Sequence, residues 1–281
     1  MKSRILLPFA MFNIVLSILS GALIYLTQDK MLWFGAMIAA ASGPLYLMLV
    51  VGSGRVARTS AKLPLMQLIS AAGLFMALYA FIGMPVRSTT AFFALVVSVL
   101  GVVYVQWYVH IYSSYNRKKS QSIIKGHALP ELPLEQLDGT STTSASFVGK
   151  KTLIVFFRAN WCPLCMAQLK EIVDRASQLS ALGVQVRFVS NQSVEHSTEL
   201  AQKLDLPSDF QILFDRDLRA AKRLEIQDEG GTPMGMVGYP RDTVMATVIA
   251  LDEEGRVIFG DESDNYRVRP HPDTFMDVFE R

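Results

Sequence analysis

The sequence contains little cysteine and little histidine. Its 281 residues include two cysteines, Cys162 and Cys165, and four histidines that are scattered along the chain. A structural zinc site takes four protein ligands, most often cysteine and histidine. The cysteine pair would need two further ligands that the spacing of the chain does not supply, and we therefore expect no metal site.

Acidic and basic residues are absent from four long stretches within the first 112 residues. Each stretch holds about 20 residues, the length of helix that crosses a hydrocarbon core about 30 Å thick. Buried helices of a globular protein are the alternative, but four such stretches in succession, joined by short polar connectors, favour membrane spans. The stretches are Ile5–Leu26, Met31–Val51, Leu63–Met84 and Thr90–Tyr112.

The predicted spans contain neither cysteine nor a charged residue. The first absence excludes a thiol relay through the membrane, and the second argues against a proton or ion path. Small residues recur as Gly35-x-x-x-Ala39 and Gly73-x-x-x-Ala77, a spacing typical of closely packed membrane helices. We expect residues 1–112 to form a four-helix region that anchors the protein in the lipid bilayer.

Lysine and arginine are distributed unevenly between the connectors of the two sides. Only Lys30 and Arg87 lie on one side, and nine lie on the side that holds both termini. The positive-inside rule then places both termini in the cytoplasm, so we predict a multi-pass protein of the bacterial inner membrane. In that reducing compartment a dithiol cycles instead of remaining a disulfide. The nine are Lys2, Arg4, Arg55, Arg58, Lys62, Arg117, Lys118, Lys119 and Lys125.

Two classes of ligand site are also missing. No basic stripe is interleaved with aromatic residues, so we expect no nucleic-acid partner. The glycine-rich segment 230–235 lacks the lysine and the spacing of a phosphate-binding loop. We interpret it as a flexible loop that flanks the active site, and we expect no cofactor.

What the chain does contain is a Cys-x-x-Cys pair between a predicted strand and a predicted helix. The apolar run Leu153–Phe157 indicates a buried strand, and Met166–Leu179 indicates the following helix. This position places the first thiol, that of Cys162, among the free N–H groups of the helix start, where the helix dipole favours thiolate. Pro163 suits the first helical turn, and a nearby Arg158 would favour thiolate further. We predict a redox-active dithiol.

Two other interpretations of the pair remain open. The cysteines are small enough to serve as buried hydrophobic residues. They could also form a permanent disulfide, although a loop this short would constrain the unfolded chain little.

Residues 113–127 are polar and basic, and we interpret them as a linker. From residue 128 to residue 281, segments of strand length alternate with helical segments, which predicts a three-layer α/β domain. The alternation in Leu129–Gly139, which ends in Asp-Gly, predicts a short strand or a hairpin. Further strands are predicted at 184–189, 212–215, 244–251 and 256–259, and further helices at 194–204, 218–224 and 272–280.

Several segments of this domain together resemble a known family. They are the Leu-Pro…Leu-Asp-Gly start at 129–139 and the segments 151–157, 160–169, 212–217 and 246–259. Through them, residues 128–281 resemble the thioredoxin-like redoxins, specifically the branch of alkyl hydroperoxide reductase and thiol-specific antioxidant proteins. The resemblance implies a thioredoxin-like fold and an antioxidant oxidoreductase, and it covers just over half the chain.

The resemblance is incomplete at the positions that decide the chemistry. The peroxiredoxin pattern Pro-x-x-x-Thr-x-x-Cys places its proline on Arg158, its threonine on Cys162 and its peroxidatic cysteine on Cys165. A second arginine of that family falls near Met245, so we expect the peroxide-activating residues to be incomplete. The thioredoxin pattern makes Cys162 the exposed nucleophile and Cys165 the resolving thiol, but its proline also falls on Met245.

Our main hypothesis is a membrane-anchored thiol–disulfide oxidoreductase in which Cys162 attacks a substrate disulfide and Cys165 releases the product. The first alternative is a peroxiredoxin-like thiol peroxidase in which Cys165 is oxidised to sulfenic acid and Cys162 resolves it. The second alternative is a non-catalytic redox sensor or membrane scaffold. The resemblance implies a disulfide or peroxide substrate and a cytosolic dithiol reductant of the thioredoxin or glutaredoxin type. The supporting residues that we expect around the pair are Arg158, Asn160, Trp161 and Pro163.

Overall fold

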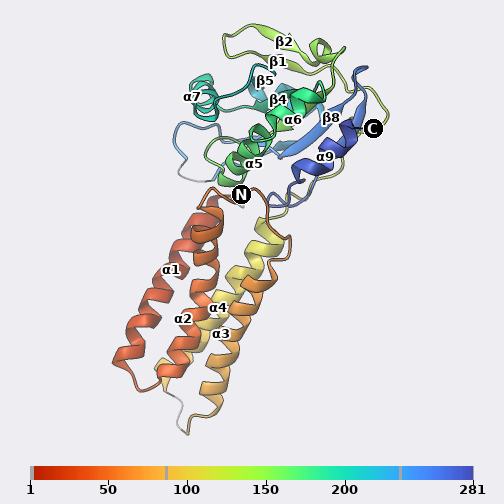
Figure 1. Ribbon diagram of the computed structural model, residues 1–281. Coiled ribbons are helices and arrows are strands. Elements are labelled where there is room, and N and C mark those ends of the chain that lie inside the picture. Colours follow the sequence, from red (N-terminus) through yellow and green to blue (C-terminus); the bar gives the residue numbers. More distant parts are fainter. Residues whose placement is uncertain (1–2, 86–87, 234–235, 281) are drawn as a thin grey trace. The chain divides into compact units, whose positions relative to one another are not determined.

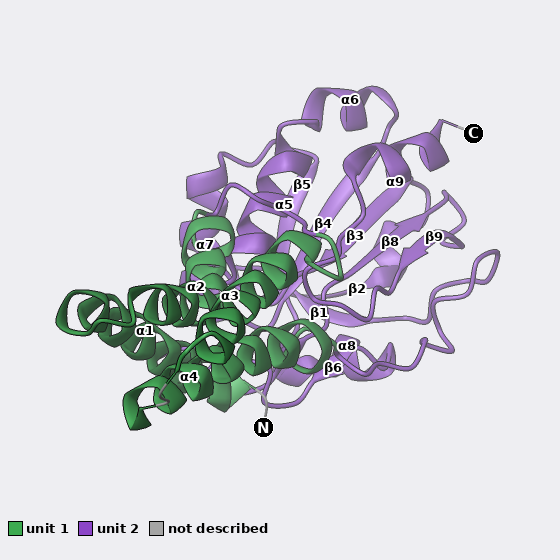
Figure 2. Ribbon diagram, turned by 90° about the horizontal axis from the view of Figure 1, so that it is seen from below, with its two compact units in different colours: residues 1–53, 60–114 green, residues 54–59, 115–281 purple. Residues whose placement is uncertain are grey.

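The computed structural model describes residues 3–85, 88–233 and 236–280. The chain divides into two compact units, which are coloured separately in Figure 2. Unit 1 comprises residues 1–53 and 60–114, and unit 2 comprises residues 54–59 and 115–281. The segment 54–59 therefore belongs to unit 2, although in sequence it lies between two helices of unit 1. Unit 2 also includes residues 115–127, for which we expected a linker.

Unit 1 consists of the four predicted apolar helices (Figure 1). Each is long and apolar enough to cross a membrane. Of the residues used to predict their orientation, Lys2 and Arg87 lie outside the described part of the chain. The helices are α1 (Ser3–Leu26), α2 (Lys30–Tyr46), α3 (Pro64–Ile82) and α4 (Thr89–Gln106), and single π-helical segments, η1 (Leu47–Val51) and η2 (Trp107–Tyr112), extend α2 and α4.

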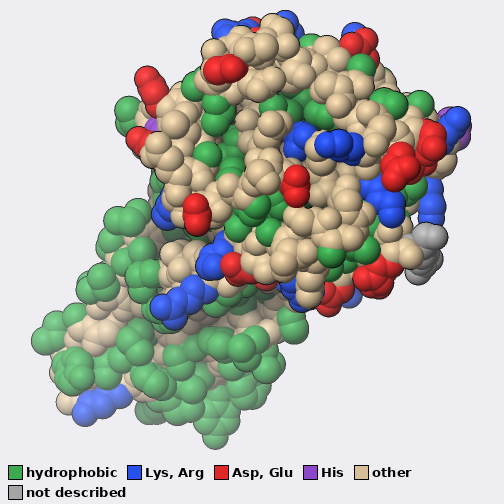
Figure 3. Space-filling view, turned by 45° about the horizontal axis from the view of Figure 1, so that its top comes forward, with side chains coloured by type: hydrophobic (Ala, Val, Ile, Leu, Met, Phe, Trp, Pro, Cys, Tyr) green, Lys and Arg blue, Asp and Glu red, His purple; other side chains and the backbone are tan. Residues whose placement is uncertain are grey.

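Small residues fill the interior of unit 1, and large apolar side chains cover its outside. Ala36, Ala39 and Ala77 are fully buried, whereas Phe75 is 71% exposed and Ile18 is 69% exposed. In Figure 3 the surface of the helices is largely hydrophobic, whereas the surface of unit 2 is mixed. Outward-facing apolar side chains and close-packed small residues are the arrangement expected of helices surrounded by lipid.

The two predicted small-residue motifs pack against each other. A Cβ added to Gly35 would lie 2.7 Å from the backbone nitrogen of Ala77, and a Cβ added to Gly73 would lie 2.6 Å from that of Ala39. Either substitution would therefore push backbone against backbone. The prediction of close-packing faces is confirmed, and the faces join α2 to α3.

Unit 2 is built on a seven-stranded sheet in the order β2-β1-β5-β4-β3-β8-β9. β3 pairs in parallel with β4, and β4 with β5, while the remaining neighbours are antiparallel. A separate antiparallel pair joins β6 to β7. The strands are β1 (Pro133–Glu135), β2 (Ser141–Thr143), β3 (Thr152–Phe156), β4 (Gln185–Ser190), β5 (Phe210–Phe214), β6 (Gln227–Asp228), β7 (Thr243–Val244), β8 (Thr247–Leu251) and β9 (Val257–Asp261).

Helices complete unit 2, and one prediction about them was wrong. The helix after the cysteines begins at Pro163 and not at Met166, because the proline is accommodated at its first position. It also ends earlier than predicted, and a second short helix follows. The helices are α5 (Pro163–Val173), α6 (Ala176–Ala181), α7 (Val194–Leu204), α8 (Arg219–Arg223) and α9 (Pro272–Phe279), with 3₁₀ turns η3 (Ser144–Phe147) and η4 (Arg216–Leu218).

The central strand β3 is buried on both faces. All five of its residues are buried, and because side chains alternate along a strand, neither face can be open to solvent. Ile154 and Phe156 share one apolar cluster with Ala220 and Leu224 of the α8 region. The strand therefore holds a fixed position at the centre of the sheet, and the segment that follows its carboxyl end carries the two cysteines.

Candidate active site

The segment from Phe157 to Trp161 connects β3 to α5 and is tied to its neighbours through its backbone. The carbonyl of Arg158 accepts hydrogen bonds from the hydroxyl groups of Thr243 (2.8 Å) and Ser190 (3.3 Å). The N–H of Asn160 donates to the side-chain oxygen of Gln192 at 2.7 Å. These bonds come from two different strands and their loops, so they fix where α5 begins and where the thiols lie.

Both cysteines are free thiols at the start of α5, and both are buried. Cys162 is the N-cap residue, but its side chain makes no capping hydrogen bond to the helix. Its residue exposure is 2%, and that of Cys165 is zero. The expectation that Cys162 is exposed and that the helix start stabilises its thiolate is therefore wrong.

The charges and hydrogen bonds around the pair favour the thiolate at Cys165. Our main hypothesis had made Cys162 the attacking thiol. The hydrogen bond that Cys162 donates to Cys165, with burial, raises the pKa of Cys162 well above its usual value. Burial alone would raise the pKa of Cys165 as well. The bond from Cys162, the charge of Arg269, and the backbone N–H and charge of Arg158 outweigh it and lower the pKa of Cys165 to about 5. Cys165 is therefore the thiolate at neutral pH.

Arg269 is the cation that faces this thiolate. Its Nη2 lies 3.5 Å from the Cys165 sulfur, its Nη1 donates to the side-chain oxygen of Gln168 at 3.1 Å, and its Nε donates to the carbonyl of Tyr266 at 2.9 Å. Arg269 is 6% exposed. Within residues 3–85, 88–233 and 236–280 no carboxylate forms an ion pair with it. A buried charge needs a partner of opposite sign, and the Cys165 thiolate is the group that provides it.

Arg158 is the second buried cation of the site, but a carboxylate partly neutralises it. Its guanidinium lies 3.5 Å from Asp228 Oδ2 and donates to the carbonyl of Gly231. The same group lies over the rings of Trp161 (4.9 Å) and Tyr266 (5.5 Å), an arrangement that stabilises a cation by its interaction with the ring faces. The charge of Arg158 also favours the thiolate of Cys165.

The remaining predicted residues have structural contacts around the pair. Trp161 packs on Arg158, and Pro163 begins the helix. Asn160 accepts a hydrogen bond from the hydroxyl of Tyr239, whose ring stacks on His196 with centroids 4.4 Å apart. The loop that contains Tyr239 is thereby attached to the segment before the cysteines. Met234 and Gly235, part of the predicted flexible loop, lie outside the described residues.

Sequence reasoning missed the arginine that completes the site. The family pattern directed attention to Met245, which packs instead against the apolar cluster of the sheet. Arg269 reaches Cys165 from 104 positions further along the chain, in the segment before α9. Arg269 thus supplies an arginine that we did not expect, while Arg158 and Cys162 still occupy the proline and threonine positions of the peroxiredoxin pattern. The Arg-Val-Arg spacing at 267–269 just before a helix was the available signal, and alone it was too general to use.

The described residues contain no group of three or more His, Cys, Asp and Glu side chains that could hold a metal ion.

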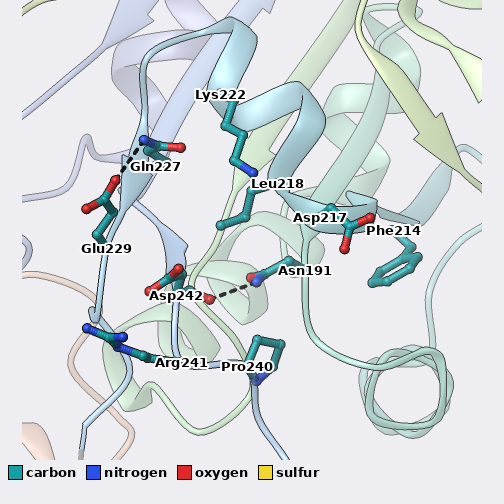
Figure 4. A pocket seen from close by; sticks show the side chains of 10 residues that line it. All are labelled: Asn191, Phe214, Asp217, Leu218, Lys222, Gln227, Glu229, Pro240, Arg241 and Asp242. Carbon is teal, nitrogen blue, oxygen red and sulfur yellow. Dashed lines mark hydrogen bonds between the residues drawn. The ribbon is translucent and has the colours of Figure 1, made fainter.

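A pocket of about 500 Å³ is lined by residues that neighbour Asp228 (Figure 4). Gln227 and Glu229, the neighbours of Asp228, line it, and so do the cations Lys222 and Arg241. Asp228, which lies between Gln227 and Glu229 in sequence, is the ion-pair partner of Arg158.

The fold and site together define a thioredoxin-like α/β domain that presents a paired thiol and thiolate at the start of a helix. Residues 125–259 match the sequence model of the AhpC/TSA family. The chain is 28% identical over 134 residues to a bcp-type peroxiredoxin of Coxiella burnetii, a match that covers 48% of this chain and 85% of the relative. It is 26% identical over 123 residues to the chloroplastic peroxiredoxin Q of Oryza sativa subsp. japonica, which covers 44% of this chain.

Residues 125–259 of unit 2 are accordingly similar in sequence to the AhpC/TSA family, and the domain resembles the peroxiredoxins. The chain spans about half the length of the rice relatives, 53% in each case. A solved structure of reduced Prx3 from Vibrio vulnificus is similar with a TM-score of 0.49 and 21% identity, over 57% of this chain and 99% of that one. The helices of unit 1 lie outside the segment that the family model matches.

Proposed function

We propose that the protein is a membrane-anchored thiol peroxidase in which Cys165 reduces hydroperoxides and Cys162 resolves the product. The observation that carries this proposal is the contact between Cys165 and Arg269, two buried groups 3.5 Å apart. A thiolate, and not a thiol, is the nucleophile that attacks peroxide. Arg269 and the N–H of Arg158 stabilise that form at Cys165, and the family match supports the same chemistry.

The reaction proceeds in two steps that balance. The Cys165 thiolate attacks one oxygen of the hydroperoxide, the O–O bond breaks, and the leaving alkoxide or hydroxide takes a proton from water. Cys165 is thereby oxidised to sulfenic acid. Cys162 then loses its proton, attacks the Cys165 sulfur and expels hydroxide, which yields a disulfide and, after protonation, water. A dithiol of the thioredoxin or glutaredoxin type returns both cysteines to the reduced form.

The position of Cys162 suits a resolving residue better than an attacking one. Its hydrogen bond to Cys165 raises its pKa, so the free enzyme holds its proton until Cys165 has been oxidised. After that step the negative charge on Cys165 is gone, and the bond that held the proton on Cys162 weakens. Oxidation of the first thiol therefore activates the second.

We further propose that the four helices of unit 1 span the bacterial inner membrane with unit 2 in the cytoplasm. Lysine and arginine predominate on that side. Support also comes from the segment 54–59, which belongs to the same compact unit as residues 115–281. Two parts of one unit must lie on one side of the membrane, and two spans, α3 and α4, separate them in sequence. An even number of crossings agrees with this topology.

The test of the peroxidase reaction uses the reduced full-length protein in detergent and its Cys162→Ser and Cys165→Ser variants. Each is mixed with one equivalent of hydrogen peroxide in a stopped-flow instrument, and Trp161 beside the pair gives the fluorescence signal. A sulfenic-acid probe that forms a covalent adduct then identifies the oxidised sulfur. We expect fast consumption and an adduct at Cys165 in Cys162→Ser, and consumption at the rate of a free thiol in Cys165→Ser.

The opposite pattern would favour the disulfide reductase. In that case both variants would consume peroxide no faster than a free thiol does, and reduced protein would instead reduce a protein disulfide in a reaction that Cys162→Ser abolishes. Peroxide consumption by Cys165→Ser at the parent rate would exclude Cys165 as the peroxidatic residue.

A further inference from the structure

The segment Gly54–Thr59, between the second and third helices, belongs to unit 2, the unit that contains the cysteines. Ala57 within it is 3% exposed, so the segment is packed and not merely adjacent. In sequence it connects α2 and its π-helical extension, which ends at Val51, to α3, which begins at Pro64. We refer to residues 54–59 as the connector.

The connector makes its first contact with the helix that carries Cys165. The Arg58 guanidinium forms a two-pronged ion pair with the carboxylate of Glu171 on α5, in which Nη1 and Oε1 are 3.3 Å apart and Nη2 contacts Oε2. Paired parallel hydrogen bonds fix orientation as well as distance. Glu171 lies one helical turn beyond Gln168, the residue that accepts a hydrogen bond from Arg269.

Its second contact is with the segment that supplies the arginine of the site. The N–H of Thr59 donates to the carbonyl of Arg267, and the guanidinium Nη1 of Arg267 donates to the hydroxyl of Thr59, both at 2.9 Å. Arg267 is fully buried. Two residues further on, Arg269 lies against Cys165. The connector therefore binds the two elements whose meeting brings guanidinium and sulfur together.

We propose that Arg58 and Thr59 are positioning residues for the Cys165–Arg269 pair, so that the connector between two membrane helices sets the reactivity of the thiolate. Neither residue touches the sulfur. Arg58 fixes α5, and Thr59 fixes the backbone from which Arg269 extends. The inference rests on the proposed role of Cys165 as the attacking thiolate. The contacts of Arg58 with Glu171 and of Thr59 with Arg267 are the same whichever oxidant reacts with Cys165.

In a buried site, the attraction between the Arg269 guanidinium and the Cys165 thiolate depends on the distance between them and on the exclusion of water. Arg269 is held at Cys165 by contacts to Gln168 and to the carbonyl of Tyr266, and both of those residues belong to the elements that the connector binds. If either element shifts outward, the separation of charge grows and water can enter, which weakens the attraction on both counts. The thiolate then becomes less stable relative to the thiol.

The test compares Arg58→Gln/Thr59→Val with Lys62→Gln in the full-length protein, all in a Cys162→Ser background that leaves one thiol. Lys62 is the matched control because it is exposed, lies close by in the same inter-helix segment and loses one positive charge in the same way. The readout is the rate of Cys165 alkylation by iodoacetamide between pH 4 and pH 9. A residue with a merely structural role would not move the midpoint of this profile.

We expect the midpoint of the double variant to rise by about one pH unit, which lowers the rate at pH 5 roughly five-fold and leaves the rate at pH 9 unchanged. Lys62→Gln should match the parent. The reversed pair Arg58→Glu/Glu171→Arg should restore the parent midpoint, because the ion pair re-forms with its charges exchanged. If the double variant lowers the melting temperature substantially, Thr59→Val alone is used, and the midpoint of its pH profile is compared with that of the parent.

A midpoint of the double variant equal to that of the parent would overturn the proposal. The proposal and the proposed function fail in different ways. If the parent protein does not consume peroxide faster than a free thiol while the connector variants still move the midpoint, the peroxidase reaction is wrong and the positioning role stands. If peroxide is consumed rapidly and the midpoint is unaffected, the positioning role is wrong.

Discussion

Replacing Arg269 by methionine is the most direct perturbation of the site. Methionine approximates the length of the arginine stem but removes the charge and the three hydrogen bonds to Cys165, Gln168 and the carbonyl of Tyr266. Arg269→Lys is the companion variant, because lysine keeps the charge and loses the planar fork. Both are made in the Cys162→Ser background, so that Cys165 is the only thiol.

The expected magnitude follows from the distance of 3.5 Å between Nη2 and the sulfur. At an effective dielectric constant near 20, unit charges at this separation attract by about 4 to 5 kcal/mol, and delocalisation over the guanidinium reduces this to about 3 kcal/mol. One pH unit corresponds to about 1.4 kcal/mol. The methionine variant should therefore raise the pKa of Cys165 by about two pH units, since the N–H of Arg158 remains in place.

The assay is the pH dependence of the thiolate absorbance near 240 nm, with iodoacetamide alkylation as a second measure. One pH unit above the midpoint of the Cys162→Ser protein, the thiolate fraction should fall from about nine-tenths to about one-tenth in Arg269→Met, while well above both midpoints the two proteins should react alike. Arg269→Lys should lie between them. A midpoint in Arg269→Met within half a pH unit of the parent would refute the reasoning, because the thiolate would then owe its stability to other groups.

Three further results are expected. Gly73→Leu should lower the melting temperature of the detergent-solubilised protein, because its side chain would meet the backbone at Ala39, whereas the same change at the exposed Gly83, where an added Cβ meets nothing closer than 3.6 Å, should not. Glu135→Gln should destabilise the fold at pH 7 by up to about 1 kcal/mol. The hydrogen bond and charge of Arg216 lower the pKa of Glu135. In denaturant titrations, the difference in free energy of unfolding between parent and variant should therefore vanish as the pH falls through that lowered pKa. The parent should gain stability relative to Cys165→Ser as the pH rises from about 5 to 8, because unfolding then takes up a proton on that thiol.

The architecture of both units could be predicted from the sequence because it depends on local patterns. The four uncharged stretches became the four helices, and the helix at 194–204 matches α7 residue for residue. The hairpin with its Asp-Gly turn formed as predicted, between β1 and β2. Each of these features is determined by composition or periodicity within a dozen or two residues, so neighbouring residues suffice to specify it.

The chemistry of the thiols could not be predicted in the same way, because it depends on contacts between distant parts of the chain. Helix dipole and spacing favoured Cys162 as the thiolate, but those local effects are weaker than a guanidinium placed against Cys165 by residue 269. The same limit applies to Arg58 and Thr59, whose partners lie 113 and 208 positions away. Position along the chain gives no indication of such neighbours.

The location of both cysteines on the first turn of α5 also bears on how the site withstands damage. In the proposed reaction, Cys165 sulfenic acid can either be captured by Cys162 or meet a second peroxide, which would carry it irreversibly to the sulfinic state. Capture requires no helix to unwind and no second chain, because Cys162, the N-cap residue, and Cys165 lie at the start of the same helix. The sulfenic acid should therefore be short-lived, and the enzyme should resist hyperoxidation during bursts of peroxide that would inactivate a site whose resolving thiol must travel.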